Sequence, residues 1–398
     1  MPERLYYTQP SLVEFDAVVT AASRVGDRPA VVLDATAFYP TSGGQPCDTG
    51  SLGEARVVDV VESDEGDVLH LLDRALAPGQ RVHGRIDADR RFDHMQQHTG
   101  QHVLSAAFDR LHRARTVGFH LGAAVSTVDL SVELSPQDIA AAETEANRIV
   151  WENRVVSIRF VSEAEAASLP LRKDPDRGGT LRVIEVAGYD LSACGGTHVA
   201  GTGSIGLIGV LSSERLRGGT RLEFVCGGRA LRSFRTHRDS VAACIRRVSV
   251  VPEELPAAVE RLQADLHDHR KALRNLQERL AGYDAAALAA RAEAIGGGRR
   301  VVEAVDGCDQ IGLNAMASSM CTAAGFEVAL FSTSPPYVVV VARSADRPLD
   351  CGRVVRALTA RFGGRGGGKA ERAQGGGMTG RLEEILQAAR DQMTNAAA

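Results

Sequence analysis

Hydrophobic and polar residues alternate in short runs through the first ninety positions of the chain. Gly, Asp and Pro separate these runs, a pattern typical of short β-strands joined by turns. The predicted strands lie at 30–33, 56–61, 68–72 and 81–86. We therefore expect residues 1–90 to form a β-rich domain.

The pattern changes near Asp93, where apolar positions begin to recur every three to four residues. This spacing predicts a helix that ends near Leu111. A second helix is expected over 136–153, with Ser135 as its N-cap and a proline directly after it. Further strands are predicted at 155–161, 180–186, 205–211 and 221–226. Residues 91–248 are thus expected to form a mixed α+β domain.

A long amphipathic helix is predicted within residues 249–295. Its apolar positions alternate three and four apart, which is the a/d pattern of a coiled coil. The pattern comprises Val259, Leu262, Leu266, His269, Leu273, Leu276, Leu280 and Tyr283. Because it lasts only about four heptads, it predicts an arm or one half of a hairpin. The alternative is an ordinary amphipathic helix packed on a domain.

A small α/β unit is predicted over 296–398. Strands near 300–305, 327–332 and 337–342 alternate with helices near 309–324 and 352–362. The glycine-rich segment 363–377 carries basic residues among its glycines and lies between two helices. We therefore expect a defined loop there and not a flexible linker. Taken together, the patterns predict an α+β protein.

The composition of the 398-residue chain is typical of a soluble globular protein with more than one domain. Its formal net charge of −4 argues against a polycationic protein, although the segment from Arg353 to the C-terminus is basic. The N-terminus lacks the pattern of a signal peptide, and no apolar run approaches the roughly 20 residues that cross a membrane. Seven scattered cysteines indicate free thiols and a cytoplasmic location.

Four residues are candidate metal ligands. His98 and His102 are four residues apart in a predicted helix, so both imidazoles leave one face about 6 Å apart. Such a pair also occurs on solvated helix faces, and it lacks the intervening glutamate of a zinc protease. Cys194 and His198, in the motif CGGTH, add a thiolate and a third imidazole. Three nitrogens and one sulfur suit a tetrahedral Zn²⁺ ion. A buried cysteine beside a chance histidine is the alternative.

These histidine and cysteine motifs resemble those of the editing domain of alanyl-tRNA synthetase and of the AlaX family of free-standing editing proteins. Three further stretches are similar to that family: LDATAFYPTSGGQPCDTG, the segment 201–231, and GGRGGGKAERAQGGG near the C-terminus. The resemblance covers nearly the whole chain. It implies an N-terminal β-barrel-like domain, an α+β editing core with a zinc site, a coiled-coil or helical arm, and a small C-terminal α/β domain of the synthetase type.

A full synthetase places its aminoacylation and tRNA-recognition domains ahead of this region. Here the β domain starts within a few dozen residues of Met1. We therefore expect the long AlaX form, without aminoacylation activity.

The resemblance implies an aminoacyl-tRNA deacylase that needs no ATP. Its expected substrate is tRNA(Ala) mischarged with serine, or with glycine. A hydrolytic sieve of this kind is needed because an apolar pocket discriminates poorly between substrates that differ by one small group. Thr36 is the candidate for the family threonine that contacts the serine hydroxyl, and Thr41 is the second candidate. For either residue, a structural role in a turn is the alternative.

The role of the metal is open between two mechanisms. If all four residues bind zinc, its shell is full. It then positions the 3′ end of the tRNA or exchanges a ligand, while the terminal ribose hydroxyls assist the attacking water. If only three bind, activation of a water by the metal is straightforward. We expect positioning. A pocket glutamine of the synthetase has no counterpart in the segment 116–122, where His120 is the candidate substitute.

The resemblance also implies that the C-terminal domain binds the outer corner of the tRNA and forms a homodimer through its sheet or the helical arm. Arg365, Lys369 and Arg372 are candidates for phosphate contact, unless their charges merely solvate the loop. Two other functions stay open. One is editing of another mischarged tRNA such as Ser-tRNA(Thr), and the other is a non-catalytic, zinc-stabilised tRNA-binding protein. No membrane partner is expected.

Overall fold

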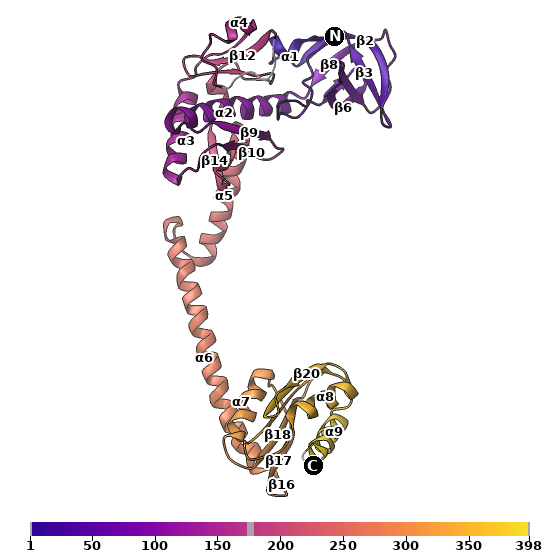
Figure 1. The fold of residues 1–398 in the computed structure, drawn as a ribbon, viewed down its shortest axis with the longest axis vertical. Helices are drawn as coiled ribbons and strands as arrows, with labels where there is room; N and C mark the ends of the chain where they lie inside the picture. Colours follow the sequence, from indigo (N-terminus) through magenta and orange to yellow (C-terminus); the bar gives the residue numbers. More distant parts are fainter. Residues whose placement is uncertain (1, 173–178, 397–398) are drawn as a thin grey trace. The chain divides into compact units, whose positions relative to one another are not determined.

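The computed structural model describes residues 2–172 and 179–396. The chain forms two compact units, Met1–Cys244 and Ile245–Ala398, and each is described by itself (Figure 1). The elements confirm the α+β fold class. Among the described residues, no helix is both long and apolar enough to cross a membrane.

The first unit begins with a closed six-stranded barrel, which confirms the β-barrel-like domain. Around the barrel the strand order is β2-β3-β7-β6-β5-β8. The strands are β2 (Glu14–Val25), β3 (Arg28–Leu33), β5 (Gly50–Leu52), β6 (Ala55–Glu62), β7 (Val68–Leu72) and β8 (Arg81–Ile86). The sequence pattern missed β2, whose last six residues are all exposed and carry no alternation, and β5, which has only three residues. A short helix, α1 (Leu5–Thr8), precedes the barrel, and β1 (Glu3–Arg4) pairs with β4 (Ala35–Thr36).

Helix α2 (Ala88–His112) forms the centre of the rest of this unit. It begins earlier than predicted, because the side chain of Asp87 caps it by accepting a hydrogen bond from the backbone N–H of Arg90. All of its residues from His94 to Phe108 are buried. Such a helix has no outer face, so it must be covered by other elements.

Helix α3 (Pro136–Trp151) packs on α2 and has the predicted cap, in which the Ser135 hydroxyl accepts from the backbone N–H of Asp138. Two antiparallel sheets complete the unit, in the orders β14-β15-β10-β9 and β11-β12-β13. Their strands are β9 (Thr116–Leu121), β10 (Ser126–Leu130), β11 (Val156–Val161), β12 (Leu181–Val186), β13 (Asp190–Ala193), β14 (Ile208–Leu216) and β15 (Gly219–Cys226). Two short elements, α4 (Glu163–Ala166) and the 3₁₀ helix Thr202–Ile205, connect them.

Helix α5 (Gly227–Val248) follows β15 directly and was not predicted from the sequence. Only Arg229 and Ala230 are buried among its residues. Its apolar residues recur three and four apart at Leu231, Phe234, Val241, Ile245 and Val248, but Arg238 breaks the run.

The second unit contains α6 (Leu255–Ala290), after a 3₁₀ turn at Pro252–Glu254. The predicted long helix is confirmed, and the apolar a/d residues from Val259 to Tyr283 are exposed in this chain. At its C-terminal end, Ala281, Ala285 and Leu288 pack into the core of the α/β fold.

The α/β fold is built on a six-stranded sheet of order β16-β17-β18-β19-β21-β20. Its elements are β16 (Glu293–Ile295), β17 (Gly298–Val305), α7 (Gln310–Cys321), β18 (Phe326–Ser332), β19 (Tyr337–Arg343), α8 (Cys351–Phe362), β20 (Arg365–Gly368), β21 (Arg372–Met378) and α9 (Leu382–Asn395). Alternate residues of β18 serve opposite faces, because side chains point to alternate sides of a strand. Leu330 packs with α6 and α7, and Phe331 packs with α8 and α9.

The glycine-rich segment 363–377 is not the loop that we predicted but a hairpin, in which β20 pairs with β21 at the edge of the sheet. Close approach explains its glycines. A Cβ atom on Gly366 would lie 2.6 Å from a side-chain carbon of Val355 in α8. Only glycine lets the helix and the hairpin approach so closely.

Candidate metal centre

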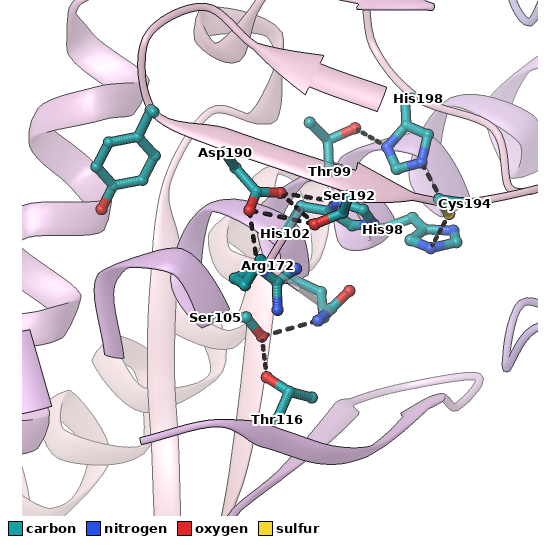
Figure 2. A network of polar contacts seen from close by, with 12 residues as sticks. His98, Thr99, His102, Ser105, Thr116, Arg172, Asp190, Ser192, Cys194 and His198 are labelled. Carbon is teal, nitrogen blue, oxygen red and sulfur yellow. Dashed lines mark hydrogen bonds and ion pairs between the residues drawn. The ribbon is translucent and has the colours of Figure 1, made fainter. Parts of the chain in front are cut away.

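The four predicted ligands converge on one point of the first unit. Their potential ligand atoms all lie within 4.8 Å of one another, although the two halves of the set are about a hundred residues apart in the sequence. His98 and His102 leave one face of α2, and Cys194 and His198 lie in the turn after β13 (Figure 2). The thiol sulfur of Cys194 is 3.3 Å from Nε2 of His98 and 3.4 Å from Nε2 of His198.

The turn that carries Cys194 and His198, the ligand turn, requires glycine at position 196 because of close packing, not because of its backbone conformation. Neither Gly195 nor Gly196 has a positive φ. A Cβ atom on Gly196 would instead lie only 2.1 Å from Cε1 of His98. Glycine at this position therefore lets the turn lie directly against the first histidine of α2.

Each of the three histidines is oriented by a hydrogen bond from its Nδ1 atom. His98 donates to Oε1 of Gln45 at 2.7 Å, and His102 donates to Oδ2 of Asp190 at 3.1 Å. Nδ1 of His198 lies 3.2 Å from the hydroxyl of Thr99, which accepts from it when Nε2 of His198 binds a metal ion. In the neutral form of an imidazole whose Nδ1 donates in this way, the lone pair lies on Nε2, the atom that faces the common point.

Two separations in the cluster match those of ligands around one metal ion. Two ligands at the usual zinc distances of about 2.0 to 2.3 Å, set at a tetrahedral angle, are about 3.5 Å apart. The sulfur–nitrogen separations of 3.3 and 3.4 Å agree with that value. The four residues can therefore hold a metal ion, and their donor set favours zinc over the hard cations that prefer oxygen.

The electrostatics of the cluster favour the ligand form of the thiol. Burial raises the pKa of Cys194, but neighbouring His98 and His198 more than compensate and hold it well below its usual range. Burial lowers the pKa of His198 to about 3, which keeps this imidazole neutral. For His102 burial also lowers the pKa, but the bonds to Asp190 and Cys194 outweigh it and raise the pKa to about 9. Metal binding at neutral pH is therefore expected to release a proton from His102.

Asp190, which orients His102, is itself held by hydrogen bonds from other residues. It lies between His102 and Arg172, whose Nε donates to Oδ1 at 2.7 Å, and the Ser192 hydroxyl donates to it as well (Figure 2). Burial raises the pKa of Asp190, but the bonds from His102 and Arg172 lower it to about 2, so the carboxylate stays ionised.

Gln45 is a site residue that the sequence did not reveal. It lies in the glycine-rich loop before β5 and is completely buried. Besides its bond with His98, its Oε1 accepts from the backbone N–H of Thr197 at 3.2 Å, and its Nε2 donates to the Thr197 hydroxyl at 2.9 Å. One side chain from the barrel domain thus joins both halves of the ligand set. The available signal was the motif SGGQP, in which a polar residue follows two glycines.

Replacing Gln45 with leucine is expected to lower the affinity for zinc about 10–100-fold, the usual cost of losing a group that orients a ligand. Competition with a chromophoric chelator would measure this affinity. Gln45→Glu keeps an acceptor for His98 and should retain more affinity than Gln45→Leu. The control Gln80→Leu, at an exposed position of the same domain, should leave the affinity for zinc unchanged. Equal zinc affinity in Gln45→Leu and the parent protein would refute the orienting role.

Arg182 holds the ligand turn from the other side. Its Nη1 donates to the carbonyl oxygens of Cys194 at 2.6 Å and Gly196 at 2.9 Å, while its Nε donates to that of Tyr7 at 2.9 Å. The side chain is buried, and this guanidinium links the turn to the segment before the barrel. Nothing in the spacing of Arg182 indicated such a role.

The two threonine candidates lie elsewhere in the barrel domain. Thr36 is completely buried, 2.8 Å from Nε2 of His70, and its hydroxyl also accepts from the backbone N–H of Phe38. Thr41 is exposed, and its hydroxyl accepts from the backbone N–H of Cys47 at 3.1 Å. Among the hydrogen bonds of the described residues, neither threonine bonds to a metal-ligand candidate. Their part in serine recognition stays a prediction.

Residues 116–121 of the segment in which the family glutamine has no counterpart form strand β9. Phe119 lies beside the metal centre, with its ring centroid 5.4 Å from that of His98. His120 is exposed and pairs in register with Thr127 of β10.

The three predicted phosphate contacts all lie on the β20–β21 hairpin of the second unit, and all are exposed. Lys369 and Arg372 form its turn, where the backbone N–H of Lys369 donates to the carbonyl of Arg372. They also line a cavity of about 710 Å³, together with Arg343. Arg365 lies on the edge strand outside that lining. The structure thus places two of the three residues at one concave surface.

Comparison with known proteins relates two segments of the chain to tRNA synthetases and a third to the DHHA1 domain. The model of class II (A) tRNA synthetases matches residues 8–90. The model of the threonyl and alanyl tRNA synthetase second additional domain matches residues 181–223, which include Cys194 and His198. The DHHA1 domain matches residues 297–395.

Among curated proteins, alanine–tRNA ligase of Methanoregula boonei is 37% identical over 395 residues, which cover 94% of this chain and 41% of the ligase. The enzyme of Methanoculleus marisnigri is 35% identical and covers 99% of this chain and 44% of its own length. The chain thus spans about two fifths of the length of the curated relatives it matches. A solved C-Ala domain of Aquifex aeolicus alanyl-tRNA synthetase aligns at 18% identity and a TM-score of 0.24, covering 26% of this chain and 97% of that one.

The matched segments follow one another along the chain, and the curated ligases align with nearly all of it. The predicted family resemblance is therefore confirmed. The chain is an AlaX-like, alanyl-tRNA synthetase-related protein.

Proposed function

We propose that this chain is a trans-editing hydrolase, which deacylates tRNA(Ala) mischarged with serine or with glycine. The observation that carries the proposal is the convergence of His98, His102, Cys194 and His198 on one point. Two of these residues lie in the segment that matches the second additional domain of threonyl and alanyl tRNA synthetases. We further propose zinc as the metal, tRNA(Ala) as the partner and the cytoplasm as the location.

The geometry supports a division of roles among the residues. Gln45, Asp190 and Thr99 hold the three imidazoles, and Arg182 holds the backbone of the ligand turn. When bound, zinc would supply a positive charge beside the substrate ester. With four protein ligands its shell would be full, so we favour positioning of the 3′ end, with the terminal ribose hydroxyls assisting the attacking water. Thr36 and Thr41 remain the proposed contacts to the serine hydroxyl.

One assay tests the function. Hydrolysis of Ser-tRNA(Ala), Gly-tRNA(Ala), Ala-tRNA(Ala) and Ser-tRNA(Thr) would be compared with and without a zinc chelator. We expect hydrolysis of the first two, loss of activity with chelator, and recovery on adding zinc. Preferred hydrolysis of Ser-tRNA(Thr) would instead favour editing of another tRNA. No hydrolysis of any of the four would leave a zinc-stabilised tRNA-binding protein.

The second unit is proposed to bind the tRNA through the β20–β21 hairpin and to form a homodimer. Replacing Arg365, Lys369 and Arg372 with alanine should raise the dissociation constant for tRNA and flatten its dependence on salt, because each lost phosphate contact lowers the slope by about 0.7–0.9. Fluorescence anisotropy at several KCl concentrations measures both quantities. Substituting exposed Arg299, Arg353 and Arg381 of the same unit provides a control of equal charge. An unchanged salt slope in the hairpin variant would refute the contact.

A further inference from the structure

Helix α5 carries a strong local charge that the proposed function has not used. It contains six arginines and one aspartate in 22 residues, in a chain whose formal net charge is −4. Arg232, Arg235 and Arg238 follow one another at intervals of three residues and are all exposed. Since 3.6 residues make one turn, these three side chains lie within about a third of the helix circumference. They form a basic strip, which we define as Arg232, Arg235 and Arg238.

The basic strip is only weakly neutralised by acidic groups. Arg232 lies 3.6 Å from Asp93, which already binds Arg229 at 2.6 Å. Arg238 pairs with Asp239 beside it on the same exposed surface. Exposed pairs of this kind are weak and readily exchanged for other anions.

The start of α5 is bonded to α2, the helix that carries His98 and His102. The contacts come from Asp93, Gln96 and Gln97 of α2. Arg229 is buried and paired with Asp93. The backbone N–H of Gly228 donates to Oε1 of Gln96 at 3.2 Å. Gln97, next to His98, accepts from the backbone N–H of Cys226 at 2.7 Å and donates to its carbonyl at 3.0 Å.

A glycine is required at this junction. Gly227 has a φ of +51°, and a Cβ atom there would lie 2.2 Å from Nε2 of Gln96. The basic strip therefore begins less than two helical turns from a junction that is bonded directly to the helix of His98 and His102. An anion bound on the strip would be held in a defined position relative to the metal centre.

We propose that the basic strip of α5 binds the phosphate backbone of the double-stranded acceptor arm of a tRNA, whose 3′ end enters the metal centre. The inference rests on the proposed function. Arginine suits phosphate because its planar guanidinium offers two parallel N–H donors. The strip acts as a positioning surface for the stem beside the reacting end, separate from the predicted contacts on the β20–β21 hairpin.

A membrane surface is the competing partner, because α5 also exposes Leu231, Phe234 and Val241. The bonded junction with α2 favours RNA. A helix that inserts into lipid needs no defined position beside a metal centre. An RNA stem whose 3′ end must reach that centre does need to be held in such a position.

The test uses the full chain and an uncharged RNA hairpin that copies the acceptor arm of tRNA(Ala). Binding is measured by fluorescence anisotropy between 50 and 300 mM KCl. The variant R232Q/R235Q/R238Q should bind roughly tenfold more weakly or worse at low salt, and its salt slope should fall by about 2 to 3. The control R28Q/R74Q/R81Q removes the same charge from exposed positions of the barrel domain and should bind like the parent chain. R232K/R235K/R238K keeps the charge and should restore most of the affinity and the slope.

Equal RNA affinity and slope in the glutamine variant and the parent would overturn the inference. So would loss of binding to vesicles of phosphatidylserine and phosphatidylcholine with RNA binding unchanged, since that result assigns α5 to a lipid surface. Because the hairpin is uncharged, the result does not depend on deacylation. A chain that binds RNA through α5 but hydrolyses none of the four charged tRNAs would sustain this surface and refute the proposed hydrolase.

Discussion

Cys194→Ala is expected to remove zinc from the purified protein and abolish deacylation of Ser-tRNA(Ala). Loss of a group that merely orients a ligand costs about 10–100-fold in metal affinity, so loss of the only sulfur ligand should cost more. The sulfur lies within 3.4 Å of two of the histidine nitrogens, and none of the other cysteines belongs to the cluster of described residues. Zinc content by mass spectrometry and the rate of deacylation measure the two effects.

The matched control is Cys244→Ala, at an exposed cysteine of α5. It should keep both zinc and activity. Each protein should be assayed before and after reloading with zinc, because a weakened site can be refilled at high metal concentration. Full activity of reloaded Cys194→Ala would contradict an essential metal held by this thiolate. Loss of activity with zinc retained would indicate that the other three ligands bind the metal and that the thiolate has another role.

Asp48→Ala is expected to destabilise the first unit by about 3–5 kcal/mol, the usual effect of leaving a buried charge unpaired. Asp48 is completely buried and accepts from Nη2 of Arg91 at 2.5 Å. It also accepts from the backbone N–H of Tyr39 at 2.6 Å. Arg91 would keep only its bonds to carbonyl oxygens of Ala37 and Pro10, which cannot neutralise its charge. Urea unfolding followed by circular dichroism measures the loss.

Asp16→Ala makes the same chemical change at an exposed, hydrogen-bonded carboxylate on the barrel surface. Asp16 lies 3.0 Å from His83, and its side chain is 89% exposed. The control should therefore cost less than about 1 kcal/mol. Similar losses in the two variants would show that the Arg91–Asp48 pair contributes no more than an exposed one.

The Arg91–Asp48 pair also bears on the metal centre, because it joins the barrel domain to α2, the helix that carries His98 and His102. Gln45 and Arg182 make two further links between the N-terminal region and the ligand turn. The barrel domain thus helps to build the metal centre and is more than a neighbour in the sequence. Variants that loosen it should lower zinc affinity even when no ligand is altered, as predicted for Gln45→Leu.

Local rules predicted much of the fold. The helix spacing of His98 and His102, the Ser135 cap and four of the six strands of the barrel (β3, β6, β7 and β8) depend on residues close together in the chain, and the structure contains all of them. Helix α5 and the hairpin of residues 363–377 were not predicted, each for a different reason. Arg238 breaks the apolar pattern of α5, and the many glycines indicate a turn even where close packing against α8 is what requires them.

By itself, the sequence determined the kind of site in this protein. An i, i+4 pair of histidines and a CGGTH turn specify which ligand atoms are available, because helix geometry and residue chemistry are local. Only the tertiary structure decided what surrounds them. Gln45 reaches His98 across 53 positions of sequence, and Thr36 bonds to His70 within the barrel instead of to a metal-ligand candidate. Such contacts depend on how distant segments pack together, and no spacing along the chain encodes that packing.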